Sequence, residues 1–450
     1  MAVWSALKVS ALAPGMRIDP EYYHPRALKD AEHLGSFPCR VLGDLAFVTD
    51  GIHASPDVVE DGGVRYLSAK CVKGNDFSLG DTLRISDAQH AANPRTSVRV
   101  DDVLITTVGT IGNAAVVQPD LLPANTDRHL GIIRMKEGEA TDPYFLATFL
   151  NSEFGKFQSL REATGNVQLN LFVEKIKTLL VPSLECSEAV ADKTRAAYRE
   201  RLEAARKVAE AESAVVVALG LSDLDLSPSK SYTKCLGEML TGRRFGAEFY
   251  MPAKDRVLRA LAGSPHKSLS HYVDNVRQMW NPENSTAQEV RNFDLTHALE
   301  PFLDDRQESV DISEVRSAKK RLQTGDVVIS RLRSYLRQIA VVRSTGPTPI
   351  VGSSEFVVLR PKAGLRAETL LAFLRSDLVQ TVLRWSQDGT NHPRFEEREL
   401  LTIPVPDTIV EAQSKISDLV AQGIAARQAM IKTLREAKAA IETEIRRGVA

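Results

Sequence analysis

A run of cationic side chains between residues 316 and 343 carries the clearest chemical signal in the sequence. It contains Arg316, Lys319, Lys320, Arg321, Arg331, Arg333, Arg337 and Arg343 against one acidic residue, Asp326. Guanidinium groups bind phosphate oxygens and form paired hydrogen bonds with guanine, so the run predicts contact with DNA. On a strand without a bulge, Arg331, Arg333 and Arg337 would share one face. A solvated face or internal salt bridges would produce the same pattern.

Other polar residues in the second half of the chain have side chains suited to reading bases or binding phosphates. The candidates are Ser334 and Tyr335 within the cationic run, Arg277, Gln278 and Asn281 beside an expected turn, and Asn391, His392 and Arg394 in a polar loop. The amides of Gln and Asn match adenine, and Arg matches guanine. Each candidate has an ordinary alternative: Tyr335 could pack in a core, the turn could be a plain loop, and His392 is more typical of a loop hydrogen bond than of a catalytic base.

The first half offers polar candidates in corresponding places but no arginine row. They are Thr107, Thr110 and Asn113 in the segment 106–113, Asn166 and Gln168 in the loop 164–170, and Lys70 and Lys73 in the run 65–75, with the loop 49–53 as a further segment. Glycines at positions 109 and 112 permit close approach of a backbone, and threonine hydroxyls could donate to phosphate. A tight hairpin that needs positive φ explains the same glycines equally well.

No catalytic set stands out. The string 141–145 has one proline where the Asn/Asp-Pro-Pro-Tyr loop of an adenine methyltransferase has two, and there is no Gly-x-x-x-x-Gly-Lys loop for ATP. The four scattered cysteines predict neither a zinc site nor a disulfide framework. We expect a non-catalytic protein with no cofactor or metal of its own. One alternative is a stand-alone DNA nuclease or modifying enzyme, for which Asp57 and Glu174–Lys177 would be the carboxylate and lysine groups; another is a coiled-coil bridge without DNA affinity.

Composition limits the class of protein. The chain has 450 residues, of which 43% are hydrophobic and 26% charged, as is ordinary for a soluble globular protein. A net charge of −1 gives no global attraction to nucleic acid, so any such binding must rest on local patches. The segment 3–13 is too polar for a secretory signal, and no run reaches about 18 apolar residues. We therefore expect a soluble, cytoplasmic protein.

The elements that must position these residues occur twice. The string from Arg17 to Pro25 returns from Arg244 to Pro252, with Arg, Glu, an aromatic pair and Pro at the same spacing. Further pairs are Asp102–Ile105 with Asp326–Ile329, Phe149–Ser152 with Phe373–Ser376, and Val181-Pro182 with Ile403-Pro404. A repeat of about 220 residues is far longer than a solenoid period. It predicts two similar domains, 1–182 and 230–406, each with a strand pair followed by a helix (142–160 in the first).

Each repeat runs into a long, proline-free, charge-rich segment, 183–222 in the first case and 407–450 in the second, with a linker at 223–229. Apolar residues recur in the second segment at heptad-like spacing, namely Ile416, Val420, Ile424, Ile431, Leu434, Ile441 and Ile445. We predict two long helices in an antiparallel coiled coil, and hence an α+β protein with pseudo-two-fold symmetry. The alternative is that each helix packs only on its own domain.

Across nearly its whole length the chain resembles the specificity subunit of type I restriction–modification systems. The features that carry the resemblance are the segment Asp102–Gly112, the string Gly165-Asn166-Val167-Gln168, the Val-Pro and Ile-Pro exits, and Glu411-Ala412-Gln413 at the start of the last helix. The second half departs from this pattern at Ser330–Tyr335 and at Gly389–Pro393. There the glycine turn and the Gly-x-x-Gln feature are replaced, which leaves the bases read by that half open.

The resemblance implies two target-recognition domains that each read one half of a split site in double-stranded DNA. It also implies methyltransferase (M) subunits and, through them, restriction and translocation (R) subunits as partners in phage defence. S-adenosylmethionine, ATP and Mg²⁺ are expected on those partners and not on this chain. Two readers at a fixed spacing would select the spacer length, because bending DNA to reach a displaced half-site costs on the order of several kcal/mol.

Overall fold

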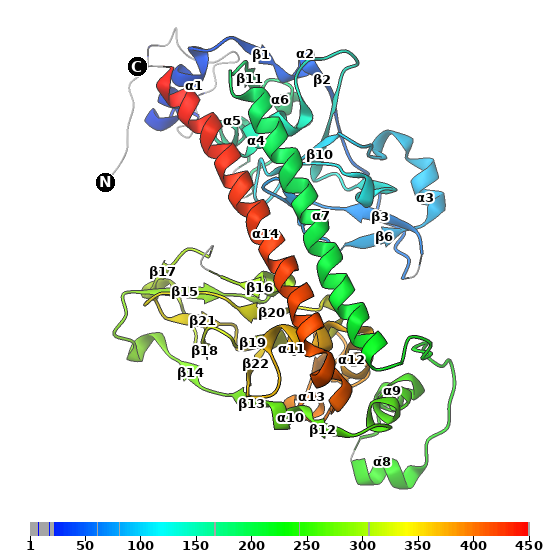
Figure 1. Ribbon diagram of the computed structural model, residues 1–450. Coiled ribbons are helices and arrows are strands. Elements are labelled where there is room, and N and C mark those ends of the chain that lie inside the picture. The colour runs from blue at the N-terminus through cyan, green and yellow to red at the C-terminus, as the bar shows by residue number, and fades with distance from the viewer. Residues whose placement is uncertain are drawn as a thin grey trace. The chain divides into compact units, whose positions relative to one another are not determined.

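The computed structural model describes residues 8, 18, 22–60, 62–80, 82–165, 168–242, 244–304 and 307–448. The chain divides into two compact units (Figure 1). The first unit consists of residues 1–201 with 428–450, and the second of residues 202–427. Each unit therefore combines a β-rich stretch of chain with part of each long helix.

The β-rich part of the first unit alternates short strands with short helices. In chain order the elements are α1 (Pro25–Gly35), β1 (Cys39–Val41), α2 (Leu42–Leu45), β2 (Ala46–Asp50), β3 (Val64–Leu67), β4 (Val72–Lys73), β5 (Asp76–Phe77), β6 (Leu83–Ile85), α3 (Asp87–Ala92), η2 (Pro94–Thr96), β7 (Val103–Thr106), β8 (Ala114–Val116), η3 (Pro119–Leu121), β9 (Ala124–Thr126), β10 (Leu130–Met135), α4 (Pro143–Asn151), α5 (Glu153–Glu162), α6 (Val173–Ile176) and β11 (Leu180–Pro182).

The central sheet of the first unit has the strand order β2-β10-β7-β8, and its pairs are antiparallel. Strand β7 is buried throughout and mostly apolar because both of its faces are covered. Val103 and Ile105 belong to one core cluster with residues of α4 and α5, whereas Leu104 belongs to a second cluster on the other face. A second sheet, β6-β3-β9, contains the parallel pair β3–β9, and β1 pairs with β11.

The elements of the second unit follow the same order, with additional short strands and helices among them. They are α8 (Leu236–Gly242), η4 (Ala247–Tyr250), α9 (Pro252–Ala262), β12 (His266–Ser268), α10 (Leu269–Tyr272), β13 (Val273–Val276), β14 (Met279–Trp280), η5 (Pro282–Asn284), β15 (Glu289–Phe293), η6 (Leu295–Leu299), β16 (Phe302–Leu303), β17 (Val310–Asp311), η7 (Ile312–Glu314), β18 (Lys319–Leu322), β19 (Val327–Ser330), η8 (Ser334–Leu336), β20 (Ile339–Val342), β21 (Ile350–Gly352), β22 (Phe356–Pro361), α11 (Ala367–Arg375), α12 (Asp377–Arg384), β23 (Gln387–Asp388), β24 (Arg394–Phe395), α13 (Glu397–Leu401) and β25 (Pro404–Pro406).

The sheets of the two units have matching topology. The order β13-β22-β19-β20 corresponds to β2-β10-β7-β8 and is extended by β16. The parallel pair β15–β21 corresponds to β3–β9, and the pair β12–β25 corresponds to β1–β11. The repeat read in the sequence is therefore a repeat of fold, and the predicted α+β class is confirmed. The pairing of Val181-Pro182 with Ile403-Pro404 is wrong by two residues, because the strand register matches Val181-Pro182 with Val405-Pro406.

The aspartate that opens each repeated strand motif is buried and forms an ion pair with a partly exposed arginine. Asp102 is 2% exposed, and its Oδ2 lies 2.6 Å from Nη2 of Arg134. Asp326 is 1% exposed, and its Oδ1 lies 2.8 Å from Nε of Arg360. These hydrogen bonds raise the pKa of both arginines. The repeated aspartate thus has a structural role in both units. Residues that bind a ligand are expected where the two units differ.

The helix expected over 142–160 is two helices, α4 and α5, and that expectation is wrong in its detail. The break falls at Ser152, whose Oγ accepts a hydrogen bond from the backbone N–H of Gly155 as the cap of α5. Gly155 is required there because a Cβ atom would lie 2.3 Å from the carbonyl oxygen of Phe149. Ser376 caps α12 after α11 in the same way.

The two long helices, α7 (Ser187–Ala218) and α14 (Asp407–Arg447), pack against each other in antiparallel directions. In the first unit the beginning of α7 meets the end of α14: Val190 and Ile441 share a core cluster, and the backbone N–H of Glu185 donates to Glu444. In the second unit a later part of α7 meets an earlier part of α14, with Gly423 against Val208. The predicted antiparallel pairing is therefore confirmed.

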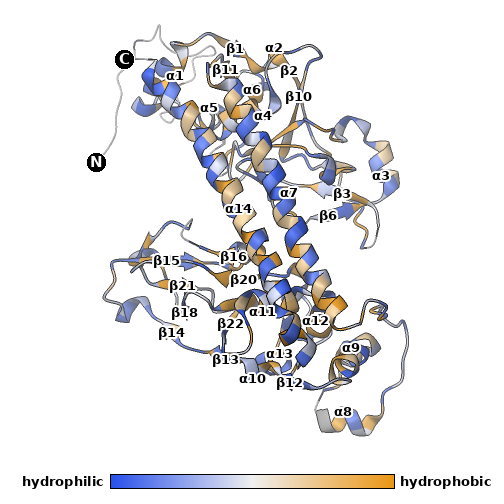
Figure 2. Cartoon of the chain, in the orientation of Figure 1, coloured by the Kyte–Doolittle hydropathy of each residue, from blue (hydrophilic) through white to orange (hydrophobic). Residues whose placement is uncertain are grey.

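The buried seam of α14 follows the predicted spacing with one shift. Its buried hydrophobic residues are Ile409, Ile416, Val420, Ile424, Met430, Ala437, Ile441 and Ile445, and Ser417 is buried beside them. Met430 and Ala437 thus take the places expected for Ile431 and Leu434, which are only half-buried. Figure 2 shows hydrophilic and hydrophobic residues interspersed along both long helices. Among the described residues, no helix combines the length and apolar character needed to cross a membrane.

Candidate nucleic-acid interface

Three loops meet at one place in each unit, and we call this place the loop junction. In the first unit the loops are 107–113, 127–129 and 164–171, of which residues 166 and 167 lie outside the described part. In the second unit they are 331–338, 353–355 and 388–395. The loops of the two units connect equivalent strands. The first loop connects β7 to β8 in the first unit and β19 to β20 in the second. The second loop connects β9 to β10 in the first unit and β21 to β22 in the second.

Backbone hydrogen bonds join the loops of the first junction. The N–H of Thr107 donates to the carbonyl of His129 at 3.0 Å, and the N–H of Leu171 donates to the carbonyl of Thr107 at 2.9 Å. Thr107 therefore lies between the other two loops, and its side chain is buried.

The second junction is built by the same bonds. The N–H of Arg331 donates to the carbonyl of Glu355 at 3.1 Å, and the N–H of Phe395 donates to the carbonyl of Arg331 at 3.2 Å. Arg331 thus occupies the place of Thr107, and Glu355 occupies the place of His129. The two junctions share a backbone and differ in their side chains.

The predicted row of arginines along one strand face is wrong. Strand β19 ends at Ser330, and Arg331, Arg333 and Arg337 lie in the loop that follows it. Arg333 has φ 50° and Arg337 has φ 49°, both in the left-handed region that a strand cannot contain. Sequence periodicity assumed an extended backbone and could not detect these two residues in a turn.

The equivalent positions in the first junction are glycines. Gly109 and Gly112 have φ 76° and 78°, which glycine adopts without steric cost. An L-residue with a side chain in this region costs about 1–2 kcal/mol, because Cβ approaches the following carbonyl oxygen. The second unit therefore keeps the turn but places arginine, at a cost in strain, where the first unit has glycine. Strain of this kind is typical of functional positions.

Three of the four arginines in the second junction are held by acidic groups. The carboxylate of Glu355 binds Nη2 of Arg394 at 2.9 Å and Nε of Arg331 at 2.9 Å. These hydrogen bonds, that of Arg394 first, hold the pKa of Glu355 below its ordinary value. Arg337 binds Asp377 and Glu212. Ion pairs within the second unit therefore account for the arginine at position 337.

Arg333 is different. Its backbone N–H donates to the carbonyl of Pro393 at 2.8 Å, and its Nη2 donates to the carbonyl of Asn391 at 3.3 Å. In the described part of the chain, its guanidinium has no carboxylate partner. Tyr335, two residues later, is 54% exposed, whereas Ser334 is 4% exposed. Arg333 and Tyr335 can therefore meet a ligand, and the Ser334 hydroxyl is enclosed.

The remaining candidates of the second unit separate into two groups. Asn391 and His392 are exposed and belong to the junction, as does Arg394, whose Nη1 donates to the carbonyl of His392 at 3.0 Å. Arg277, Gln278 and Asn281 are exposed around β14, outside the three junction loops. Arg277 binds Glu397 at 3.1 Å, and Asn281 caps η5 through the N–H of Glu283.

In the first junction, two of the candidate side chains are buried or hydrogen-bonded within the unit. The side chain of Thr107 is 6% exposed, and Asn113 accepts a hydrogen bond from Nζ of Lys156, a lysine whose pKa is lowered to about 8 by burial. Thr110 and Gln168 are exposed and face solvent. Asn166 lies outside the described residues.

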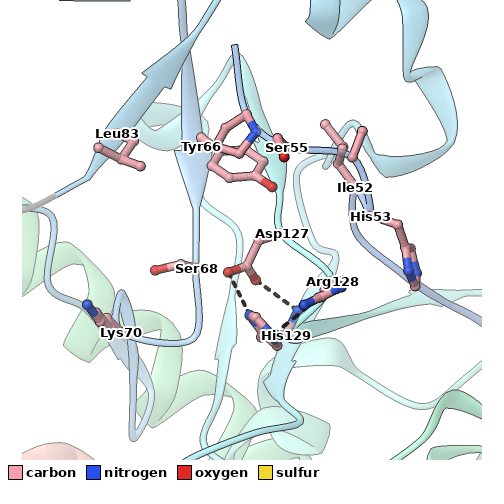
Figure 3. Close-up of a pocket in the computed structure, with 12 residues that line it drawn as sticks. Ile52, His53, Ser55, Tyr66, Ser68, Lys70, Leu83, Asp127, Arg128 and His129 are labelled. Atoms are coloured by element: carbon pink, nitrogen blue, oxygen red, sulfur yellow. Dashed lines mark hydrogen bonds and ion pairs between the residues drawn. The ribbon is translucent and has the colours of Figure 1, made fainter. Parts of the chain in front are cut away.

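A cavity of about 540 Å³ opens beside the first junction (Figure 3). Its lining residues are Ile52, His53, Ala54, Ser55, Pro56, Tyr66, Ser68, Lys70, Leu83, Asp127, Arg128 and His129. It brings together two segments that the sequence suggested, 49–53 and 65–75. Of the two lysine candidates, Lys70 lines the cavity, and Lys73 is exposed on β4 outside it.

Sequence reasoning missed the loop 127–129 and Glu355. The available signal was the repeat itself, since 127–129 and 353–355 both follow the repeated strand motifs Asp102–Ile105 and Asp326–Ile329 by a similar stretch of chain. Asp127 accepts a hydrogen bond from the backbone N–H of His129 at 2.9 Å and lies 3.2 Å from its Nδ1. Within the described residues, no group of three or more His, Cys, Asp or Glu side chains is placed to hold a metal ion.

Comparisons with known proteins gave matches among solved structures alone. No protein-family model matches the chain, and no curated protein matches it. A type I restriction–modification S subunit from M. genitalium is 11% identical, with a TM-score of 0.37 over 92% of this chain and 96% of the other. The HsdS subunit from Thermoanaerobacter tengcongensis is 17% identical, with a TM-score of 0.29 over 91% and 97%. A third chain, from work on complex assembly and conformational transition of the type I R-M system, is 17% identical, with a TM-score of 0.29 over 92% and 97%.

Proposed function

We propose that this chain is a sequence-specific DNA-binding subunit of the type I restriction–modification kind, which reads a two-part target without catalysing a reaction. The observation that carries the proposal is the loop junction, built twice on one backbone with different side chains. A repeated scaffold with diverged loops is what two readers of different sequences require, since loops on a rigid frame supply recognition.

The first DNA contact that we propose is made by an arginine of the second junction. The guanidinium of Arg333 donates one hydrogen bond to the carbonyl of Asn391 and has no carboxylate partner among the described residues, so its other N–H groups can bind a phosphate or the O6 and N7 atoms of guanine. Its neighbours Arg331 and Arg394 are held in fixed orientations by Glu355, which leaves other N–H groups of both available. Fixed donors lose less conformational entropy on binding than mobile ones.

Outside the two junctions, we propose a structural role for the two long helices. The long helices α7 and α14 would set the spacing between the two half-sites and hold methyltransferase subunits, through which restriction subunits join. S-adenosylmethionine, ATP and Mg²⁺ would then be bound by those partners in the cytoplasm.

The substitution Arg333→Gly tests the proposal because it restores the residue type of the first junction. Relief of left-handed strain, about 1–2 kcal/mol, roughly offsets the extra unfolded-state entropy of glycine, so the stability should stay within about 1 kcal/mol of the parent. Affinity for DNA, measured by fluorescence anisotropy, should fall about tenfold or more, with a smaller salt dependence if the contact is to phosphate.

Two controls accompany this variant. Arg259→Ala removes an exposed arginine on α9 and should leave DNA affinity nearly unchanged. Arg337→Gly relieves similar strain but loses the ion pairs to Glu212 and Asp377, so it should lower the stability instead. If Arg333→Gly and Arg259→Ala bind DNA equally well, the junction is not the DNA-reading surface.

The stand-alone enzyme is tested with the purified chain, duplex DNA, Mg²⁺ and S-adenosylmethionine. We expect binding without strand cleavage or methyl transfer. Either reaction in the absence of other subunits would replace the proposed function with that of an enzyme.

A further inference from the structure

The cavity beside the first junction has the volume and lining of a site for a small polar ring. Its volume of about 540 Å³ is in the range of small-molecule pockets. Apolar side chains of Ile52 and Leu83 and the ring of Tyr66 form walls, and Asp127 lies between Lys70 and Arg128 (Figure 3).

Asp127 is a carboxylate in the cavity with unused hydrogen-bonding capacity. His129 occupies one position on each carboxylate oxygen, through its backbone N–H at 2.9 Å and its Nδ1 at 3.2 Å. An ionised carboxylate offers about four acceptor positions, so two remain. Burial raises the pKa of Asp127 even though His129 and Arg128 act in the opposite direction. The ionised carboxylate is therefore incompletely stabilised, and a ligand that brings N–H donors would stabilise it.

We propose that this cavity binds a guanine base, with the Asp127 carboxylate accepting hydrogen bonds from N1–H and the N2 amine. Lys70 and Arg128 then supply donors for O6 and for the phosphate of the same nucleotide. The base comes either from a free nucleotide or from DNA bound at the adjoining junction, and the second source rests on the proposed function.

The other bases fit this set of groups less well. Adenine and cytosine present a ring nitrogen acceptor beside their amine, and that lone pair would face the lone pairs of Asp127. Thymine has a single N–H between two carbonyl oxygens. A phosphate or other small anion would meet the charge of Asp127 directly. Guanine alone among the common bases places two adjacent donors and one acceptor on a single edge.

Binding of free nucleotides to the full-length chain tests the proposal by equilibrium dialysis. Guanosine monophosphate should bind about tenfold or more tightly than inosine monophosphate, which lacks the N2 amine, because a charged hydrogen bond is lost. Asp127→Asn should abolish this preference, while Asp87→Asn, at an exposed aspartate of α3, should preserve it. Equal binding of guanosine, inosine and adenosine monophosphates by the parent chain overturns the proposal.

A second variant covers the case in which Asp127→Asn does not fold. Lys70 is exposed, so Lys70→Ala should leave the fold intact. It should weaken guanosine monophosphate binding severalfold. Binding of guanosine monophosphate unaffected by Lys70→Ala, with no preference over inosine monophosphate, contradicts the assignment of the cavity.

The two sources of the base, a free nucleotide and bound DNA, are distinguished with DNA that carries a fluorescent guanine analogue. The emission of this analogue rises on unstacking. A rise on binding that Asp127→Asn removes assigns the base to DNA, from whose stack it must then be extruded. Selective guanosine monophosphate binding without that rise assigns it to a free nucleotide. Absence of both overturns the guanine site, and DNA affinity measured with Arg333→Gly reports separately on the proposed function.

Discussion

A single position shows how the two units diverge while their backbone stays the same. His129 and Glu355 accept equivalent backbone hydrogen bonds, from Thr107 and Arg331. In the first unit the side chain at this position contacts Asp127 at the cavity, and in the second it binds two arginines. The same backbone position thus holds a histidine against the cavity carboxylate in the first unit and a carboxylate that pairs with two arginines in the second.

Glu355→Gln should reduce the selectivity of DNA binding. Without the carboxylate, Arg331 and Arg394 lose their fixed orientation, while the net charge rises by one. We expect weaker discrimination between target and random duplex, together with stronger binding to random duplex at low salt. Anisotropy titrations on both duplexes measure this, with Glu283→Gln at an exposed glutamate as the matched control. Unchanged discrimination would mean that the two arginines do not read bases.

The same variant should change stability with a defined pH dependence. The pKa of Glu355 is lowered from its ordinary value of 4.5, by Arg394 first and then by Arg331. A lowered pKa in the folded state adds stability above the ordinary value, and that stability is lost as the pH falls through the folded-state pKa. Denaturant unfolding should show a deficit of about 1 kcal/mol for Glu355→Gln at neutral pH, shrinking below about pH 4.5. A deficit independent of pH would assign the loss to packing.

At the residue level, composition located the cationic loop but not its geometry. Clustered arginines are visible in any sequence, so Arg331, Arg333 and Arg394 could be nominated without a structure. The left-handed φ of Arg333 could not be foreseen from its residue type, since arginine there is strained. Alignment of the two repeats would have placed it opposite Gly109 and so predicted the turn.

At the level of elements, α14 contributes to both units. Ile416, 0% exposed, lies in the part of α14 that belongs to the second unit, and Ile441, also 0% exposed, lies in the core cluster of the first. One helix thus supplies fully buried side chains to both units.

Ile441→Ala and Ile416→Ala form a matched pair on this helix. Each should cost about 2–5 kcal/mol through lost burial and a cavity. Hydrogen exchange should show lost protection in α4 and β7 for Ile441→Ala, and in α11 and β19 for Ile416→Ala. Loss of protection in all four elements for both variants would show that the units unfold together.

The elements themselves were largely predictable where the sequence is locally periodic. The strand pairs β7–β8 and β19–β20, the Pro-containing exits and both long helices follow from runs of apolar residues and from proline positions. The parallel pairs β3–β9 and β15–β21 were not predicted, because their partners lie about 60 residues apart and no local pattern encodes such pairing.

At the level of the molecule, repetition with divergence predicts independent readers. Arg333→Gly should relax selection in one half of the target only, and Arg128→Ala, in the first unit, should relax selection in the other half only. Each effect should be about 1–3 kcal/mol per base pair. Selection from a randomised duplex library, followed by sequencing of the bound fraction, measures both. Changes in the same half for both variants would contradict one reader per unit.

The membership of residues 428–450 in the first unit has a consequence for biosynthesis. Domains usually fold in the order in which the ribosome makes them. Here Ala437, Ile441 and Ile445 complete the core of the earlier-made unit, so that unit stays unfinished while the whole of the later-made one is translated. The nascent polypeptide therefore completes its two units in reverse order, and the apolar surface of the first stays uncovered until the last helix emerges.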